Sequence, residues 1–174
     1  MKTSRYFRMF MWLLFIFGGA ALGYYLDKRL FGRLYVGTWC HLICLAGGVA
    51  LMQIIRRIAR NTGRYLHDHG RRGQVPRLET NRLVTDGYYA LMRHPMHQGL
   101  MLAPWAFGLL VGSPSFVLIV APLEWLIIYV LILTFEEKEA RRKFGQAYEQ
   151  YARLTPRFCW SRSCWKKLIR GWDA

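Results

Sequence analysis

Long apolar runs alternate with short basic stretches along the chain. A membrane-spanning helix needs roughly 20 mostly apolar residues, and one apolar stretch, residues 99–135, is too long for a single crossing. The turn-forming residues Gly112–Ser115 lie near its middle, and Pro95 suits the first turn of the helix before them. The pattern therefore predicts four transmembrane helices, over residues 9–26, 34–55, 95–111 and 116–135.

Basic residues outside these spans predict the orientation of the chain. Residues 56–94 carry nine arginines, residues 136–174 are also basic, and the turn at 112–115 carries no charge. Because Lys and Arg concentrate in cytoplasmic loops, we expect a cytoplasmic loop over 56–94, a cytoplasmic tail over 136–174 and both termini in the cytoplasm. The basic start at residues 2–8 also fits a signal peptide, but the first run is long and ends without a small-residue cleavage site, which favours a retained helix.

Composition separates this chain from other basic proteins. Its 174 residues are 53% apolar and carry a net charge of +15. Such a charge is typical of proteins that bind nucleic acid or a membrane surface. Because the apolar residues form long runs, we expect the lipid bilayer as partner and not nucleic acid. The sequence therefore predicts an all-α integral membrane protein, a single domain over residues 1–174 with about four transmembrane helices and a cytoplasmic interfacial helix near the C-terminus. Such a chain suits a bacterial inner membrane, and an endoplasmic reticulum protein would show the same charge asymmetry.

The cysteines and histidines predict no metal site. Two cysteines lie within the second span, and Cys159 and Cys164 lie in the tail. Because the cytosol is reducing, we expect these cysteines to be unpaired. Their spacing lacks the paired CxxC or His pattern of a zinc site, and we expect His67 and His69, on an arginine-rich segment, to be solvated.

A polar segment, Thr85–Gly99, leads directly into the third predicted span. If Pro95 occupies the first helical turn, the free N–H groups of that helix start attract an anion such as a carboxylate or a phosphate. Arg93 and His94 would lie beside this helix start, and His97 would lie in its first turn. The segment equally fits an interfacial anchor with tyrosines and arginine at headgroup level.

Two adjacent carboxylates, Glu136 and Glu137, follow the fourth predicted span. Glutamates at the end of a membrane helix often mark a functional site, although they also fit a stop signal that opens an interfacial helix. Beyond them, residues recurring at three- and four-residue steps form a stripe that could lie on the membrane or pack over the loop: Ala140, Phe144, Ala147, Tyr148, Tyr151 and Leu154.

The predicted topology brings these two polar segments together. The third and fourth spans form a tight hairpin, so residues 93–99 and 136–137 are expected at the same depth. A helix start that attracts anions would then face carboxylates that attract cations, which suits a zwitterionic ligand from the cytosol. S-adenosylmethionine fits, because it carries a carboxylate, an ammonium and a sulfonium. NADPH would instead use the arginines.

The same residues resemble a known family. The isoprenylcysteine carboxyl methyltransferase and phospholipid methyltransferase superfamily is similar to this chain over about residues 80–158, in the order Gly87-x-Tyr89, Arg93-His94-Pro95-x-x-x-Gly99, Glu136-Glu137, Phe144-Gly145, Tyr148 and Tyr151. The resemblance implies a helical membrane enzyme that binds S-adenosylmethionine from the cytosolic side. It also implies a lipophilic methyl acceptor, which a prenylcysteine carboxylate, a phospholipid amine and a thiol all fit.

The resemblance also implies roles for individual residues. The residues that it implies at the cofactor are Tyr89, Arg93, His94, Pro95, Gly99, Glu136, Glu137 and Tyr148. Among these, the two glutamates would hold the cofactor's polar parts. Methyl transfer requires a base only if the acceptor arrives protonated, and His94 or His97 would then serve as the catalytic residue.

The chain departs from the family pattern at two places. The superfamily usually has an aromatic residue two positions after the proline, where this chain has His97. The prenylcysteine enzymes are expected to carry an arginine late in the last membrane helix, near the substrate carboxylate, whereas residues 116–135 hold no Lys or Arg. The resemblance therefore supports a methyltransferase in general more strongly than carboxyl methylation in particular.

Two other classes of function fit part of the pattern. Sterol reductases have a similar Arg-His-x-x-Tyr-x-Gly segment and acidic ending and use NADPH, but they are expected to be much longer than 174 residues. A non-enzymatic membrane subunit could instead bind anionic lipid headgroups through its loop arginines, at about 1 kcal/mol each. Binding of S-adenosylmethionine, of NADPH or of neither separates these classes.

Overall fold

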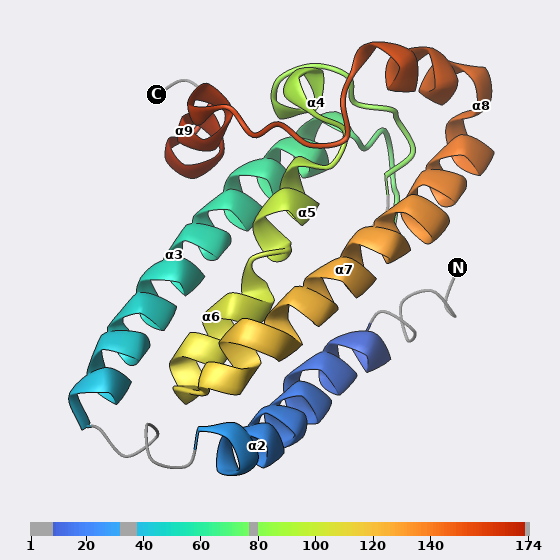
Figure 1. The fold of residues 1–174 in the computed structure, drawn as a ribbon. Helices are drawn as coiled ribbons and strands as arrows, with labels where there is room; N and C mark the ends of the chain where they lie inside the picture. Colours follow the sequence, from blue (N-terminus) through green and yellow to red (C-terminus); the bar gives the residue numbers. More distant parts are fainter. Residues whose placement is uncertain (1–8, 32–37, 77–79, 173–174) are drawn as a thin grey trace. The chain divides into compact units, whose positions relative to one another are not determined.

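The computed structural model describes residues 9–31, 38–76 and 80–172, and the regular elements in these ranges are all helices (Figure 1). They are α2 (Gly19–Leu30), α3 (Thr38–His69), α4 (Tyr88–Leu91), α5 (Pro95–Leu100), α6 (Ala103–Val111), α7 (Ala121–Leu131), α8 (Glu137–Leu154) and α9 (Arg162–Arg170), with π-helical turns at Leu14–Gly18, Phe116–Val120 and Ile132–Glu136. The basic residues at 2–8 and residues 34–37 of the predicted second span lie outside the described residues.

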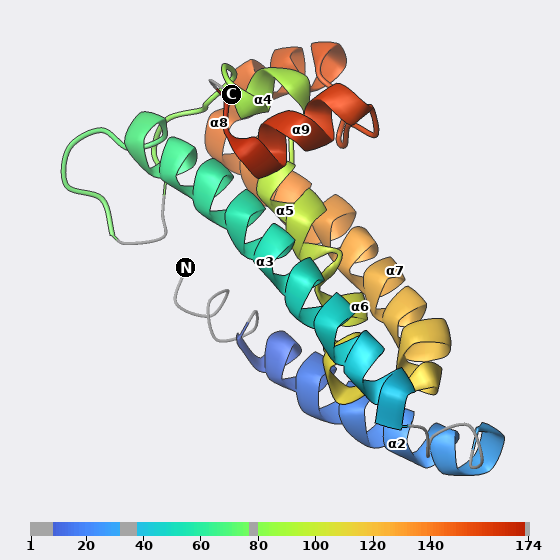
Figure 2. The same ribbon diagram turned by 90° about the vertical axis from the view of Figure 1, so that its left-hand side faces the viewer.

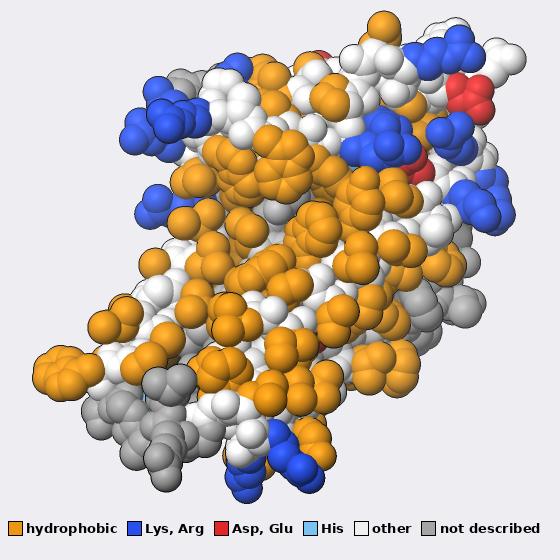
Figure 3. Space-filling view, in the orientation of Figure 1, with side chains coloured by type: hydrophobic (Ala, Val, Ile, Leu, Met, Phe, Trp, Pro, Cys, Tyr) orange, Lys and Arg blue, Asp and Glu red, His pale blue; other side chains and the backbone are white. Residues whose placement is uncertain are grey.

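Three helices are long and apolar enough to cross a membrane: Met9–Leu30, Trp39–His69 and Phe116–Leu154. Large apolar side chains are exposed along the helices, as the orange surface in Figure 3 shows. Trp39 and Ile43, for example, are 79% and 71% exposed. Because such exposure is unfavourable in water and favourable against lipid, the prediction of an all-α integral membrane protein is confirmed.

The third predicted span, residues 95–111, is two short helices in the structure. Helices α5 and α6 are separated by a turn at Met101 and Leu102. Pro104 explains the break, because it has no N–H to donate to the carbonyl of Leu100 and its ring would collide with that carbonyl in a continuous helix. The prediction of one continuous helix here is wrong. In the described residues, three helices are each long and apolar enough to span a membrane, and the predicted third span is a broken helical segment.

Helix α3 continues to His69, well past the predicted end of the second span at residue 55. Its extension is amphipathic, because Ile55, Ile58 and Thr62 are buried at three- and four-residue spacing while its arginines are exposed. The first charges end the apolar run without ending the helix. Residues 56–69 are therefore helical and are not part of a loop.

The chain forms two compact units, residues 1–52 with 101–129 and residues 53–100 with 130–174. In the first unit, Gly23 of α2 lies so close to Phe116 that a Cβ would be 3.2 Å from that ring. The buried carboxylate of Asp27 accepts a hydrogen bond from the N–H of Ser115 at 2.8 Å and caps the helix that leads into α7. The predicted turn before this helix is present.

The second unit has a core formed by α3, α4 and α9, which includes Ile58, Tyr88, Met92 and Leu168. Helix α9 lies beside α4 in both Figure 1 and Figure 2. Asn61 of α3 donates a hydrogen bond to the carbonyl of Leu168 at 2.9 Å. The segment after α8 is therefore an integral part of this unit.

Two glycines of the family-like pattern have backbone angles that favour glycine. Gly87, just before α4, and Gly145, inside α8, both have φ of 54°. A Cβ at Gly87 would lie 2.3 Å from Cζ of Tyr65, whereas a Cβ at Gly145 would meet nothing within 4 Å. Position 87 thus requires glycine for both its angle and its space, and position 145 requires it for the angle that kinks α8.

Cys159 and Cys164 form a disulfide bond, so the expectation that they are unpaired is wrong. Ser161 caps α9, since its hydroxyl accepts a hydrogen bond from the N–H of Cys164 at 3.3 Å. This turn brings the two Cα atoms to 6.1 Å, a separation that a disulfide spans. The expectation rested on the redox state of the cytosol and did not include this local geometry.

Candidate functional site

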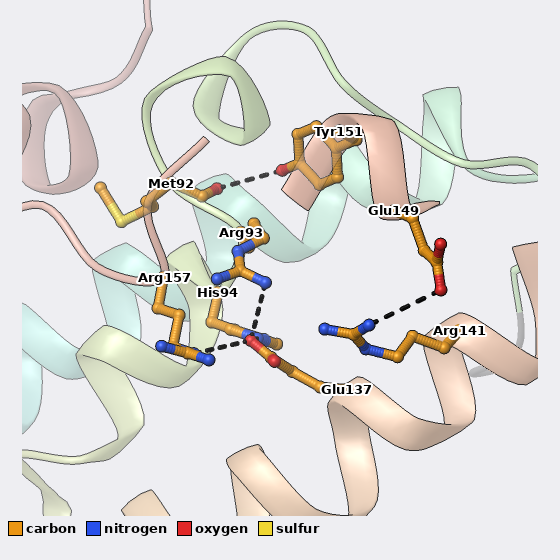
Figure 4. A network of polar contacts seen from close by, with 8 residues as sticks. All are labelled: Met92, Arg93, His94, Glu137, Arg141, Glu149, Tyr151 and Arg157. Atoms are coloured by element: carbon orange, nitrogen blue, oxygen red, sulfur yellow. Dashed lines mark hydrogen bonds and ion pairs between the residues drawn. The ribbon is translucent and has the colours of Figure 1, made fainter. Parts of the chain in front are cut away.

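Glu137 lies at the centre of a buried polar cluster in the second unit, and Figure 4 shows three basic side chains directed at its carboxylate. Its Oε1 lies 2.9 Å from Nη1 of Arg93, 3.0 Å from Nε of Arg157 and 3.5 Å from Nε2 of His94. Arg93 and His94 directly precede α5, Arg157 follows α8 and Glu137 begins α8. Two guanidinium groups at this distance favour the ionised carboxylate.

The backbone of this cluster is held by the tail segment, residues 156–159. The N–H groups of Arg93 and His94 donate to carbonyl groups of the tail segment at 2.8 Å and 3.2 Å. Gln98 pairs with Cys159 in both directions, with Nε2 donating to its carbonyl at 2.7 Å and Oε1 accepting from its N–H at 3.1 Å. The tail segment therefore fixes the chain that carries Arg93 and His94.

These bonds change the expected role of the helix start at Pro95. Helix α5 has only six residues, and the N–H groups of Arg93 and His94 just before it already donate to carbonyl groups. The side chains of Arg93 and His94 are therefore better candidates for binding a charged ligand than the dipole of a helix this short.

A cavity of about 170 Å³ lies within the same unit, beside the cluster. Among the described residues, its charged lining consists of Arg82, Arg93 and Glu136, together with His94 and His97. The remaining wall is largely apolar or aromatic and includes Leu66, Leu83, Val84, Met96, Ala140, Phe144 and Tyr151. The cavity thus offers both signs of charge next to an apolar surface.

Seven of the nine residues predicted for the site line this cavity: Tyr89, Arg93, His94, Pro95, His97, Glu136 and Tyr148. The other two do not line it. Gly99 packs against Ile58, whose Cγ2 would lie 2.6 Å from a Cβ at position 99, and Glu137 faces the basic cluster. The structure thus separates the two adjacent carboxylates, with Glu136 on the cavity and Glu137 beside the arginines.

On the cavity wall, buried Arg93 Nε has no hydrogen-bond partner in the described part of the chain, and buried His94 Nε2 forms only a long contact there. His94 Nε2 is 3.5 Å from Glu137, at the outer limit for a hydrogen bond. An unsatisfied buried polar atom costs about 1–3 kcal/mol. This wall therefore suits a polar ligand that accepts hydrogen bonds.

Aromatic side chains form another part of the wall. The stripe on α8 faces the cavity through Phe144, Tyr148 and Tyr151, whereas Leu154 at its end is 87% exposed. The hydroxyl of Tyr151 donates to the carbonyl of Tyr89 at 2.6 Å and ties α8 to α4. Burial raises the pKa of the Tyr89 phenol, so this ring stays neutral. Neutral aromatic faces attract cations.

Sequence reasoning missed Arg157 and four loop residues that line the cavity: Thr80, Arg82, Leu83 and Val84. Arg157 is one of many basic residues in the tail, and only the turn after α8 brings it to Glu137. The loop residues carry no pattern that distinguishes them from a solvated segment. These positions depend on tertiary contacts that lie far apart in sequence.

The profile of the phospholipid methyltransferase family matches residues 35–147, which is more than half of the chain. The protein therefore belongs to this family, and the resemblance drawn from its motifs is confirmed.

Two curated relatives match part of the chain. Protein-S-isoprenylcysteine O-methyltransferase B of Arabidopsis thaliana is 29% identical over 85 residues, which are 48% of this chain and 42% of the relative. Protein-S-isoprenylcysteine O-methyltransferase of Schizosaccharomyces pombe is 38% identical over 76 residues, which are 42% of this chain and 31% of the relative. The chain thus matches less than half the length of these relatives. No solved structure is significantly similar to it.

Proposed function

We propose that this protein is an S-adenosylmethionine-dependent methyltransferase that acts on a lipophilic acceptor in the membrane. The cavity wall carries the proposal, because buried Arg93 Nε lacks a hydrogen-bond partner among the described residues while His94 and Glu136 line the same cavity. S-adenosylmethionine bears groups of both signs, so these residues fit it. Membership of the phospholipid methyltransferase family and the names of the two relatives support the same reaction.

The charges of the wall assign a role to each side chain. Arg93 and His94 would hold the cofactor's carboxylate, and Glu136 would hold its ammonium group. The ring faces of Tyr89 and Tyr148 would attract the positive sulfonium. The bound cofactor supplies an electrophilic methyl group.

Glu137 is a positioning residue in this proposal. It does not line the cavity, but it lies 2.9 Å from Arg93 and offsets the charge of the basic cluster. By engaging Nη1 it orients the guanidinium while Nε stays unpaired within the described chain. Its contribution to the site therefore passes through Arg93 and His94.

The chain needs no covalent nucleophile for this reaction. Its main contribution is to hold donor and acceptor in near-attack geometry, which can supply several kcal/mol. If the acceptor arrives as a thiol or an ammonium, a base must accept its proton. His97, whose Nε2 lies 4.0 Å from Oε1 of Glu136, and His94 are the catalytic candidates.

The membrane spans give a lipophilic acceptor lateral access to the protein. A prenylcysteine carboxylate, a phospholipid amine and a lipophilic thiol are the acceptor classes that we propose. We also propose a bacterial inner membrane with both termini in the cytoplasm, on the strength of the arginines. The Cys159–Cys164 bond is less typical of a reducing compartment. Labelling of these two cysteines with a membrane-impermeant thiol reagent after reduction, in sealed and in opened vesicles, tests this orientation.

Transfer of label from [methyl-³H]S-adenosylmethionine into lipophilic acceptors tests the proposed reaction. The purified protein in nanodiscs is expected to label at least one of the three acceptor classes, and His94→Ala is expected to abolish the transfer. Absence of transfer together with binding of NADPH would favour a reductase. Absence of both would favour a lipid-binding subunit.

A further inference from the structure

Arg82 is a cavity residue that the proposed cofactor contacts do not use. It lies in the loop between α3 and α4, where its N–H donates to the carbonyl of Gly70 at 3.1 Å. The adjacent Asn81 donates to the same carbonyl at 3.0 Å, and its side chain exchanges two hydrogen bonds with the backbone of Arg72 at 2.7 Å and 2.8 Å. The backbone at Asn81 and Arg82 is therefore held by hydrogen bonds to Gly70 and Arg72.

The described charges around the cavity do not balance. Arg82 and Arg93 both line it, while Glu136 is the one carboxylate among the described residues of its wall. Arg93 is engaged by Glu137. No carboxylate in the described ranges forms an ion pair with Arg82, and residues 116–135 supply no other Lys or Arg.

Arg82 is exposed, and apolar side chains line the cavity on which it lies. Leu66, Leu83 and Val84 line the same cavity, with Phe144 from α8. A guanidinium beside an apolar wall suits a ligand with an anionic group on a hydrophobic body. Arg binds both carboxylate and phosphate oxygens through paired N–H groups.

We propose that Arg82 determines acceptor specificity by binding the anionic group, a carboxylate or a phosphate, of the lipophilic methyl acceptor. This inference rests on the proposed function, since it names the charge of the molecule that shares the cavity with the cofactor. Arg93 and His94 serve the cofactor, and Arg82 serves the acceptor.

Acceptor binding in the absence of cofactor separates this inference from the proposed function. The probes are N-acetyl-S-farnesylcysteine, its uncharged carboxamide and a short-chain phosphatidylethanolamine, measured by calorimetry in uncharged maltoside micelles. The variants are Arg82→Gln and Arg82→Lys. Arg72→Gln is the matched control, because Arg72 is exposed in the same loop and does not line the cavity.

The expected result is a loss of affinity in Arg82→Gln of about tenfold or more for the anionic probe that binds. Arg82→Lys should recover part of this affinity, and carboxamide binding and S-adenosylmethionine binding should stay within twofold of wild type. Preference for the farnesylcysteine identifies the carboxylate, and preference for the phospholipid identifies the phosphate. Equal binding of acid and carboxamide by the wild type, or equal affinities in Arg82→Gln and Arg72→Gln, would overturn the inference. A protein that shows this Arg82 effect but binds no S-adenosylmethionine would contradict the proposed function alone.

Discussion

Glu137 and Arg93 form a buried ion pair, with 2.9 Å between Oε1 and Nη1, that joins the start of α8 to the residue two positions before α5. Both side chains are less than a tenth exposed. The pair links a segment that follows the last apolar run to one that precedes α5, and Arg93 also lines the cavity. The geometry of the proposed cofactor site therefore depends on a residue that does not line the cavity.

Replacing Glu137 by Ala should destabilise the protein and weaken cofactor binding together. Removal of one partner from a buried pair leaves an uncompensated charge, and the expected loss in free energy of unfolding is about 3 kcal/mol. Chemical denaturation in micelles measures this loss. Glu149→Ala is the control, because Glu149 pairs with Arg141 at 3.7 Å on the exposed side of the same helix, and its loss should stay below about 1 kcal/mol. Equal losses in both variants would show that the buried pair contributes no more to the free energy of unfolding than the exposed pair.

Replacing Gln98 by Ala should release the tail segment. The variant loses both hydrogen bonds with Cys159. Leaving the backbone N–H and carbonyl of Cys159 without partners should lower the free energy of unfolding by about 1–3 kcal/mol. Hydrogen exchange should become faster at the amides of Arg93, His94 and Cys159. Unchanged exchange at these amides would mean that the disulfide and α9 hold the tail segment without Gln98.

The two glycines with φ of 54° should respond differently to replacement by alanine. Gly145→Ala should destabilise the protein by about 1–3 kcal/mol through its backbone angle alone. Gly87→Ala should cost more, because its Cβ would also overlap the ring of Tyr65. Thermal unfolding measures both. Adding Tyr65→Ala should relieve part of the effect at 87 only, and relief at neither position would contradict the assigned overlap.

Replacing Asp27 by Ala should affect the first unit and spare cofactor binding. Asp27 caps the helix after the 112–115 turn through the N–H of Ser115, and loss of such a cap costs about 1 kcal/mol. Asp27→Asn retains an acceptor oxygen and should be milder. Titration of Asp27→Ala with S-adenosylmethionine checks whether cofactor binding is unchanged. A large drop in affinity would contradict the prediction, because it would connect Asp27 to the proposed site.

The sequence predicted the class of the protein and seven of the residues that line the cavity, because both depend on local pattern. Apolar length predicted the membrane helices, and the motif order placed Tyr89, Arg93, His94 and Glu136 at one cavity. The break before α6 was readable from Pro104, but the apolar run concealed it.

Other features depend on contacts between distant segments. Nothing in the local sequence distinguishes Glu136 from Glu137. The turn after α8 brings Arg157 into contact with Glu137. Helix α3 continues past the arginines that suggested its end, because one face of its extension is buried. The disulfide follows from the Ser161 turn, which the redox argument did not consider.

Binding of S-adenosylmethionine to the purified protein in nanodiscs, measured by calorimetry, tests the central claim most directly. The proposal predicts saturable binding by the wild type. It predicts the same binding by the control variant Glu139→Gln, because Glu139 is exposed on α8 and does not line the cavity. It predicts at least a tenfold weaker affinity in Glu136→Gln, which loses the partner of the ammonium group. Absence of binding by the wild type, or equal affinities in Glu136→Gln and Glu139→Gln, would contradict it.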